Sequence, residues 1–283
     1  MNNKEALMDA CWALSYLSDG DDNRINAVMS VEGITRNIVA LLGHECNSVV
    51  TPAVRVLGNF VSGNDVQTQA VIDAGVLKYV DTLLNCSKKT IRKEMCWLLS
   101  NIAAGSQLQI SQLMRSARDM LLIVDTVREA PWDIRKEATW VICNIATGGT
   151  DDHVHNLVNL GVIDALCSVL DHADAKITMV VLDGIANILK VGKRAGRDYV
   201  GFVDECDGLD KIEALQEHQD NGIYQKVVEI IETYFGVEEV DDENILPAMD
   251  GNSFAFGTVT KAGEFNQTDG ALQQPLQPFN FAS

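Results

Sequence analysis

Two tryptophan–asparagine pairs, Trp97 with Asn101 and Trp140 with Asn144, combine side chains that suit an extended ligand. Each asparagine follows its tryptophan by four residues, just over one helical turn, so the two side chains share a helix face. A carboxamide offers both a hydrogen-bond donor and an acceptor, and a peptide backbone needs both. An indole face attracts a cation by ~0.5–1 kcal/mol at an exposed site. The chemistry indicated is noncovalent binding.

The same spacing recurs along the chain. Two further pairs and one variant with tyrosine in place of asparagine share it: Arg55/Asn59, Asp183/Asn187 and Trp12/Tyr16. We call the first residue of each pair its anchor. In chain order, successive anchors lie 43, 42, 43 and 43 residues apart. A period in the low forties is typical of three-helix armadillo or HEAT units. The pattern therefore predicts a stack of helical repeats with one ladder of side chains.

A helical wheel places this ladder on the polar side of its helices. Glu94 and Asn101 fall on the same side as Trp97, whereas Leu99 falls opposite. The wheel around Trp140 has the same arrangement. An aromatic row on a polar stripe favours a binding surface over core packing.

Glycines mark the same period. One set follows the anchor helices, where we expect left-handed C-terminal caps: Gly20, Gly63, Gly105 and Gly148. A second set separates two shorter helices in each unit, with Arg118 in the one missing slot: Gly33, Gly75, Gly161 and Gly208. For one unit we predict helices near 65–73, 76–86 and 89–104.

Composition agrees with an all-α solenoid. The 283 residues are 47% hydrophobic with five prolines, which supports a core spread along a stack. The sequence has no alternating apolar–polar run typical of a sheet, no segment long enough to be a membrane helix and no signal peptide. Seven cysteines scattered over the helices indicate reduced, largely buried thiols.

Charge and motifs narrow the function. A net charge of −18 disfavours nucleic acid and anionic membranes and favours basic partners. His153 and His155 lie two residues apart and off a common helix face, so we predict no metal site. No phosphate loop or activated nucleophile is recognisable, so we predict neither a cofactor nor an enzyme. Trp132, off the ladder, is expected to pack.

Four segments carry a family resemblance: DACWALSYLSDG, AVRVLGNFVSG, KEMCWLLSNIAAG and KEATWVICNIATGG. They resemble the third helices of successive armadillo repeats in importin alpha, the adaptor for nuclear localisation signals. GLDKIEALQEH and IYQKVVEIIETYFGVEE resemble the last repeat of that family. The resemblance implies a right-handed armadillo superhelix that begins inside a repeat. Residues 1–20 would hold a third helix, 21–236 about five repeats, and 237–283 an acidic run and a disordered tail.

The resemblance also implies a site and partners. Lys/Arg-rich signals would bind at the smaller of the two family sites, while the larger site and the segment that binds importin beta would be missing. The implied peptide-binding residues are Trp97, Asn101, Trp140, Asn144, Glu94, Glu137, Asn59, Arg55, Val61, Thr68, Ser100, Asn187, Trp12 and Tyr16. Among them, Val61, Thr68 and Asn101 would line a lysine slot, Asn59 and Ser100 would support the peptide, and Arg55 would interrupt the row and pair with a carboxylate. We expect the ladder to end at Asp183.

Further implied partners concern the end of the chain. The last repeat, Gly208 to Phe235, would contact the nuclear export receptor with Ran-GTP, and the protein would shuttle between cytoplasm and nucleus. The alternative is a general armadillo scaffold that binds other extended partners. Because such scaffolds typically use basic grooves for acidic peptides, the pairing of glutamate with tryptophan and asparagine favours the adaptor.

Overall fold

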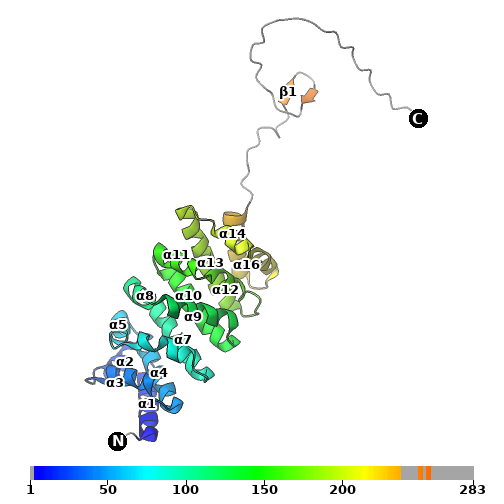
Figure 1. Ribbon diagram of the computed structural model, residues 1–283. Coiled ribbons are helices and arrows are strands. Elements are labelled where there is room, and N and C mark those ends of the chain that lie inside the picture. Colours follow the sequence, from blue (N-terminus) through cyan, green and yellow to red (C-terminus); the bar gives the residue numbers. More distant parts are fainter. Residues whose placement is uncertain (1–2, 237–247, 251–252, 256–283) are drawn as a thin grey trace, which may run out of the picture. The chain divides into compact units, whose positions relative to one another are not determined.

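The structure, a computed structural model, describes residues 3–236, 248–250 and 253–255. The chain divides into two units, Met1–Gly236 and Val237–Ser283. The larger unit is built from helices (Figure 1). In chain order they are α1 Lys4–Ser18, α2 Asp22–Met29, α3 Ile34–Ala40, η1 Leu41–Gly43, α4 Asn47–Val61, α5 Asp65–Asp73, η2 Val76–Tyr79, α6 Val80–Leu84, α7 Lys89–Ala103, α8 Gln107–Leu113, α9 Ala117–Glu129, α10 Trp132–Gly148, α11 Asp151–Asn159, α12 Val162–Cys167, α13 Ala175–Ala195, α14 Tyr199–Asp204, α15 Gly208–Ala214, η3 Leu215–Glu217, α16 Asn221–Ile230 and the π-helical turn η4 Ile231–Phe235.

Three-helix units repeat along this stack. α2–α4, α5–α7, α8–α10, α11–α13 and α14–α16 are successive units, and α1 occupies the place of a preceding third helix. The third helices pack in series, each against the next, from α1 through α4, α7, α10 and α13 to α16 (Figure 1). Fully buried Phe60, Leu99, Ile142 and Ile185 belong to one continuous core along the series. The repeat therefore places the ladder residues on adjacent helices.

Polar caps start the first helix of each unit and also join the units. Asn64 and Ser106 form capping boxes with buried Gln67 and Gln109. Gln109 Nε2 also donates to the carbonyl of Asp65 in the preceding unit across 2.8 Å. One side chain thus satisfies a helix terminus and fixes the spacing of two units.

The glycines serve two different purposes. Gly33, Gly75 and Gly161 adopt left-handed φ values of 75°, 93° and 78° at the starts of second helices. The predicted left-handed caps after the third helices were wrong, because positive φ is absent at Gly20, Gly63, Gly105 and Gly148.

A close approach explains two of the glycines after third helices. A Cβ at Gly63 would lie 1.7 Å from Gln67 Oε1, and one at Gly105 would lie 2.1 Å from Gln109 Oε1. These glycines leave room for the capping glutamines.

Helix positions match the sequence pattern closely. The helices predicted near 65–73, 76–86 and 89–104 correspond to α5, to η2 with α6, and to α7. Trp132 packs as predicted, with its ring centroid 4.0 Å from that of His172. All seven cysteines are unpaired thiols, and Cys11, Cys96, Cys143 and Cys167 are buried.

Within the described residues, no single helix is both long and apolar enough to cross a membrane; Asp22–Met29 and Ile34–Gly43 meet that test only together, across an 84° bend. In the smaller unit, β1 Ala248–Asp250 pairs antiparallel with β2 Ser253–Ala255. The acidic run at 238–243 and most of the polar tail expected to be disordered lie outside the described residues.

Candidate functional site

The ladder anchors lie one per third helix, so each can contact the next unit. We use "groove" for the face formed by the anchors Trp12, Arg55, Trp97, Trp140 and Asp183 with the ladder asparagines. Trp97 lies on α7 against the backbone of Gly58 on α4, where a Cβ would come 2.2 Å from Trp97 Cζ3. The absence of a side chain at residue 58 therefore permits the observed position of this ring. Trp97 remains partly exposed.

Arg55 reaches from α4 to the next helix in the groove. Its guanidinium carbon lies 5.6 Å from the centre of the Trp97 ring, and its Nη2 forms an ion pair with Glu94 Oε1. The Glu94 side chain is only 7% exposed, whereas that of Arg55 is 46% exposed. A cation of the protein thus occupies both the ring and its neighbouring carboxylate.

Trp140 has a similar companion. Lys176 at the start of α13 places its Nζ 5.4 Å from the Trp140 ring centre. Trp97 and Trp140 therefore each lie under a cation supplied by a neighbouring helix.

A cavity of about 190 Å³ opens beside Trp97. It is lined by Arg55, Lys93, Glu94, Trp97 and Glu137. Burial raises the pKa of Glu137, Lys93 opposes this shift, and Glu94 adds to it. A cation in this cavity would relieve the cost of that buried charge.

Ion pairs neutralise the other carboxylates of this region. Glu94 pairs with Arg55, Asp174 with Lys136 at 3.6 Å, and Asp183 with Lys226 at 3.2 Å. Within the described part of the chain, Glu137 forms no such pair. It is the groove carboxylate best placed to receive an external cation.

The ladder asparagines do not behave alike. Asn144 Nδ2 donates to the Ser100 carbonyl across 3.0 Å, and Asn187 Nδ2 donates to the Ala146 carbonyl. Asn59 Nδ2 donates to the Ser15 carbonyl at 2.8 Å and to Ser18 Oγ at 3.1 Å. These bonds satisfy groups near the C-termini of the preceding third helices.

Asn101 is the exception. Its Nδ2 is buried and has no hydrogen-bond partner among the described residues. A buried donor without a partner costs about 1–3 kcal/mol, so turning this amide outward to a ligand carbonyl would recover free energy. Asn101 and Glu137 thus lack, among the described residues, the internal partners that Asn144 and Glu94 have.

Known proteins share both the sequence and this architecture. The Armadillo/beta-catenin-like repeat family matches residues 64–104, and the Atypical Arm repeat family matches residues 197–248. Importin subunit alpha-4 of Arabidopsis thaliana is 45% identical over 255 residues, covering 87% of this chain and 47% of that protein. Importin subunit alpha-1b of Oryza sativa subsp. japonica is 44% identical over 265 residues, covering 90% and 49%. The chain belongs to the importin alpha family.

This importin alpha chain spans about half the length of the curated relatives it matches. Its fold resembles that of a designed armadillo repeat protein in complex with peptide (KR)4. The TM-score is 0.73 at 27% identity, and the match covers 82% of this chain and 95% of that one. The predicted all-α armadillo solenoid is confirmed.

The structure brings together only part of the implied peptide site. Arg55, Glu94, Trp97 and Glu137 line one cavity, and Arg55 forms the carboxylate pair expected of it. Trp12 and Tyr16 stack with ring centroids 6.2 Å apart on α1, and Tyr16 is 69% exposed. These side chains are available to a ligand.

Besides Glu94, four implied residues are buried. Asn59 is 6% exposed and both its amide hydrogens are used, so the structure does not fit the peptide-supporting role expected of it. Ser100 is equally buried, and its hydroxyl donates to the Trp97 carbonyl. Val61 and Thr68 are buried as well, and Thr68 Oγ1 donates to the Val61 carbonyl at 3.3 Å. Of Val61 and Thr68, only the backbone carbonyl of Val61 could still contribute to a lysine slot.

Sequence reasoning identified Arg55 but missed the cation that covers Trp140. Lys176 lies 36 residues beyond Trp140 in the chain, at the start of the next third helix. The signal that could have found it is a lysine or arginine near the start of the third helix of the following unit. Lys226 extends the anchor period by a further 43 residues and pairs with Asp183. The anchor row therefore continues beyond Asp183 as an ion pair.

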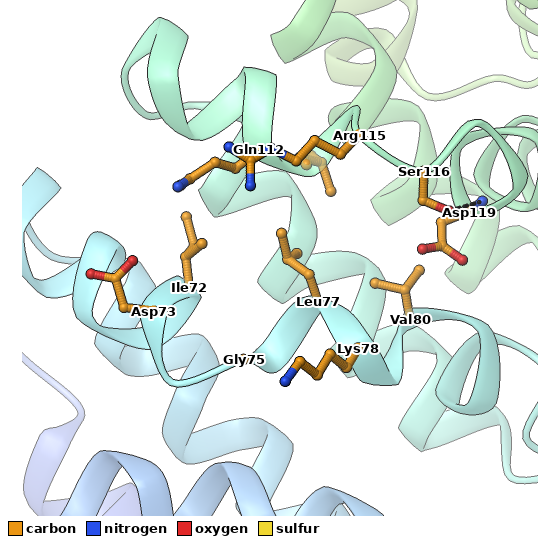
Figure 2. Close-up of a pocket in the computed structure, with 11 residues that line it drawn as sticks. Ile72, Asp73, Gly75, Leu77, Lys78, Val80, Gln112, Arg115, Ser116 and Asp119 are labelled. Atoms are coloured by element: carbon orange, nitrogen blue, oxygen red, sulfur yellow. Dashed lines mark hydrogen bonds between the residues drawn. The ribbon is translucent and has the colours of Figure 1, made fainter.

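A larger cavity of about 350 Å³ lies outside the ladder, between α5–α6 and α8–α9 (Figure 2). Apolar Ile72 and Leu77 line it together with Lys78, Arg115 and Asp119. Its mixture of charges selects no single class of ligand. The described residues contain no cluster of three or more groups able to hold a metal ion.

Proposed function

We propose that this chain is a nuclear import adaptor whose groove binds Lys/Arg-rich nuclear localisation signals. The observation that carries this proposal is the association of partly exposed Trp97 with the unpaired Glu137 carboxylate and the unpartnered Asn101 amide. A basic peptide supplies a partner for each: an aliphatic stem for the exposed part of the ring, a further positive charge for the carboxylate and a backbone carbonyl for the amide.

Two comparisons support this proposal. The matched relatives are named as importin alpha subunits, and the designed armadillo protein of similar fold is in complex with a peptide of alternating lysine and arginine. The net charge of −18 adds long-range attraction for a basic ligand. In this proposal Trp140 and Asn144 continue the site along α10, and Trp12, Tyr16 and Asn187 have lesser roles.

Further partners belong to the same proposal. As a family member, the chain would act in transport together with importin beta and would shuttle between cytoplasm and nucleus. The last unit, Gly208 to Phe235, would contact the export receptor with Ran-GTP. These roles come from membership of the family.

A peptide titration tests the adaptor against a general scaffold. Fluorescence anisotropy of a labelled (KR)4 peptide and of an acidic peptide of equal length should show binding of the basic one alone. We expect Trp97→Ala to weaken (KR)4 binding by about tenfold or more, because buried aromatic contacts carry much of the energy of an interface. Preference for the acidic peptide would favour the scaffold and overturn the adaptor.

A further inference from the structure

The groove already holds cations of its own at the positions where a basic ligand would lie. Arg55 covers Trp97 at 5.6 Å and neutralises Glu94, and Lys176 covers Trp140 at 5.4 Å. Both cations come from the helix adjacent to the ring they cover, α4 for Trp97 and α13 for Trp140. The two covers therefore stand on opposite sides of the α7–α10 pair.

We propose that Arg55 and Lys176 are internal competitors that a ligand must displace, and that they determine the specificity of the groove. The proposal rests on the proposed function. A single ligand lysine gains about as much on a ring as the internal cation loses, so it binds with little net gain. A peptide that presents several cations can displace both covers while also reaching Glu137 and Asn101. The covers thus select for clustered basic residues over isolated ones.

The two cations differ in what holds them. Arg55 has both the ring and an ion pair with the Glu94 carboxylate, whereas Lys176 has the ring and, without a direct ion pair, the attraction of the Glu137 charge. Lys176 is exposed at the first turn of α13, so its flexible stem can swing into solvent. We therefore expect a ligand to displace Lys176 from Trp140 more readily than it displaces Arg55 from Trp97.

Binding measurements with charge-matched variants test the proposal. Arg55→Gln and Lys176→Gln should each tighten (KR)4 binding about threefold or more, because each removes a competitor from a ring. Arg118→Gln is the control. It removes the same charge but lies outside the groove, where it breaks the exposed ion pair between Arg118 and Asp81, whose atoms are 3.0 Å apart. It should change affinity less than twofold, because a distant exposed charge is largely screened.

Two further variants separate the ring from the carboxylate. Arg55→Gln leaves buried Glu94 without its partner, whereas Arg55→Gln with Glu94→Gln uncovers Trp97 and removes that charge. If the uncovered ring matters, the double variant still binds a peptide with one lysine better than the wild type does. Circular dichroism establishes that each variant is folded.

A measurement without peptide makes the outcome decisive. Relative to the wild type without peptide, the indole N–H signal of Trp97 should be shifted in Arg55→Gln, and that of Trp140 should be shifted in Lys176→Gln. Unshifted signals, or (KR)4 affinities equal to or weaker than wild type in folded variants, would overturn the internal competitors. Loss of the Trp97→Ala effect on binding would instead overturn the proposed function.

Discussion

The Trp97 ring lies so close to Gly58 that a Cβ there would come 2.2 Å from Cζ3 and 2.6 Å from Cε3. The absence of a side chain at Gly58 on α4 thus determines where the Trp97 ring of α7 can lie. The ring position depends on the neighbouring unit, and so does its availability to a ligand.

Gly58→Ala should therefore impair binding more than stability. The added methyl pushes the ring away from its place, and because the ring is partly exposed it can move toward solvent. We expect (KR)4 affinity to fall about tenfold and the free energy of unfolding to fall by about 1 kcal/mol. Anisotropy and urea denaturation measure the two effects.

Gly148→Ala is the matched control, since its Cβ would meet only Ile110 Cδ1 at an ordinary 3.5 Å. Equal losses of affinity in both variants would contradict this account of Gly58.

The ladder asparagines should separate into binding and structural residues. Asn101→Ala removes a buried amide that has no partner, so stability should be unchanged or slightly higher while (KR)4 affinity falls. Asn59→Ala removes two hydrogen bonds to α1, so unfolding free energy should fall by about 1–3 kcal/mol with little direct effect on affinity. Chemical denaturation and anisotropy on both variants provide the comparison, and the reverse pattern would exclude this division.

Binding should weaken in mildly acidic solution. Burial raises the pKa of Glu137, so this side chain takes up a proton at a pH where an ordinary glutamate is still charged. Because its folded pKa is raised, its contribution to stability is complete below the unfolded pKa and is lost as pH rises through the folded one. A bound cation offsets that loss, so the ligand is held most firmly when Glu137 is ionised.

The affinity of (KR)4 measured against pH provides the test. The wild type should lose affinity as pH falls toward the raised pKa, whereas Glu137→Gln should bind more weakly at neutral pH and vary less. A wild-type profile as flat as that of the variant would show that Glu137 does not contact the ligand.

His153 should tolerate glutamine better than alanine. It takes the place held by Gln67 and Gln109 in the other capping boxes, with Nδ1 accepting from the Thr150 amide at 3.1 Å and Nε2 bonded to Ser111 Oγ at 3.0 Å. His153→Gln should therefore keep unfolding free energy within about 0.5 kcal/mol, while His153→Ala should lose about 1–2 kcal/mol. Thermal and urea denaturation measure these losses. Equal losses of unfolding free energy in the two variants would contradict this role of His153.

Much of this fold follows from the period of the sequence. A repeat near 43 residues fixes which helix carries Trp97 and Trp140, and the helical wheel puts Glu94 on the face of Trp97. The wheel cannot give depth, because burial depends on the neighbouring unit. Asn59 is on the predicted face but is covered by the end of α1.

The cations of the groove show the same limit. Lys176 and Trp140 meet through packing of α10 against α13, which no local pattern encodes. Conversely, the glycines after the third helices were misassigned to left-handed caps because spacing alone does not reveal their neighbours, such as the glutamines packed against Gly63 and Gly105.

The most direct test of the proposed binding groove follows the indole N–H signals of the four tryptophans during titration with (KR)4. Trp97 and Trp140 should shift together and saturate, while Trp132, stacked on His172, should not respond. A saturable shift of Trp132 with unchanged signals of Trp97 and Trp140 would contradict the account.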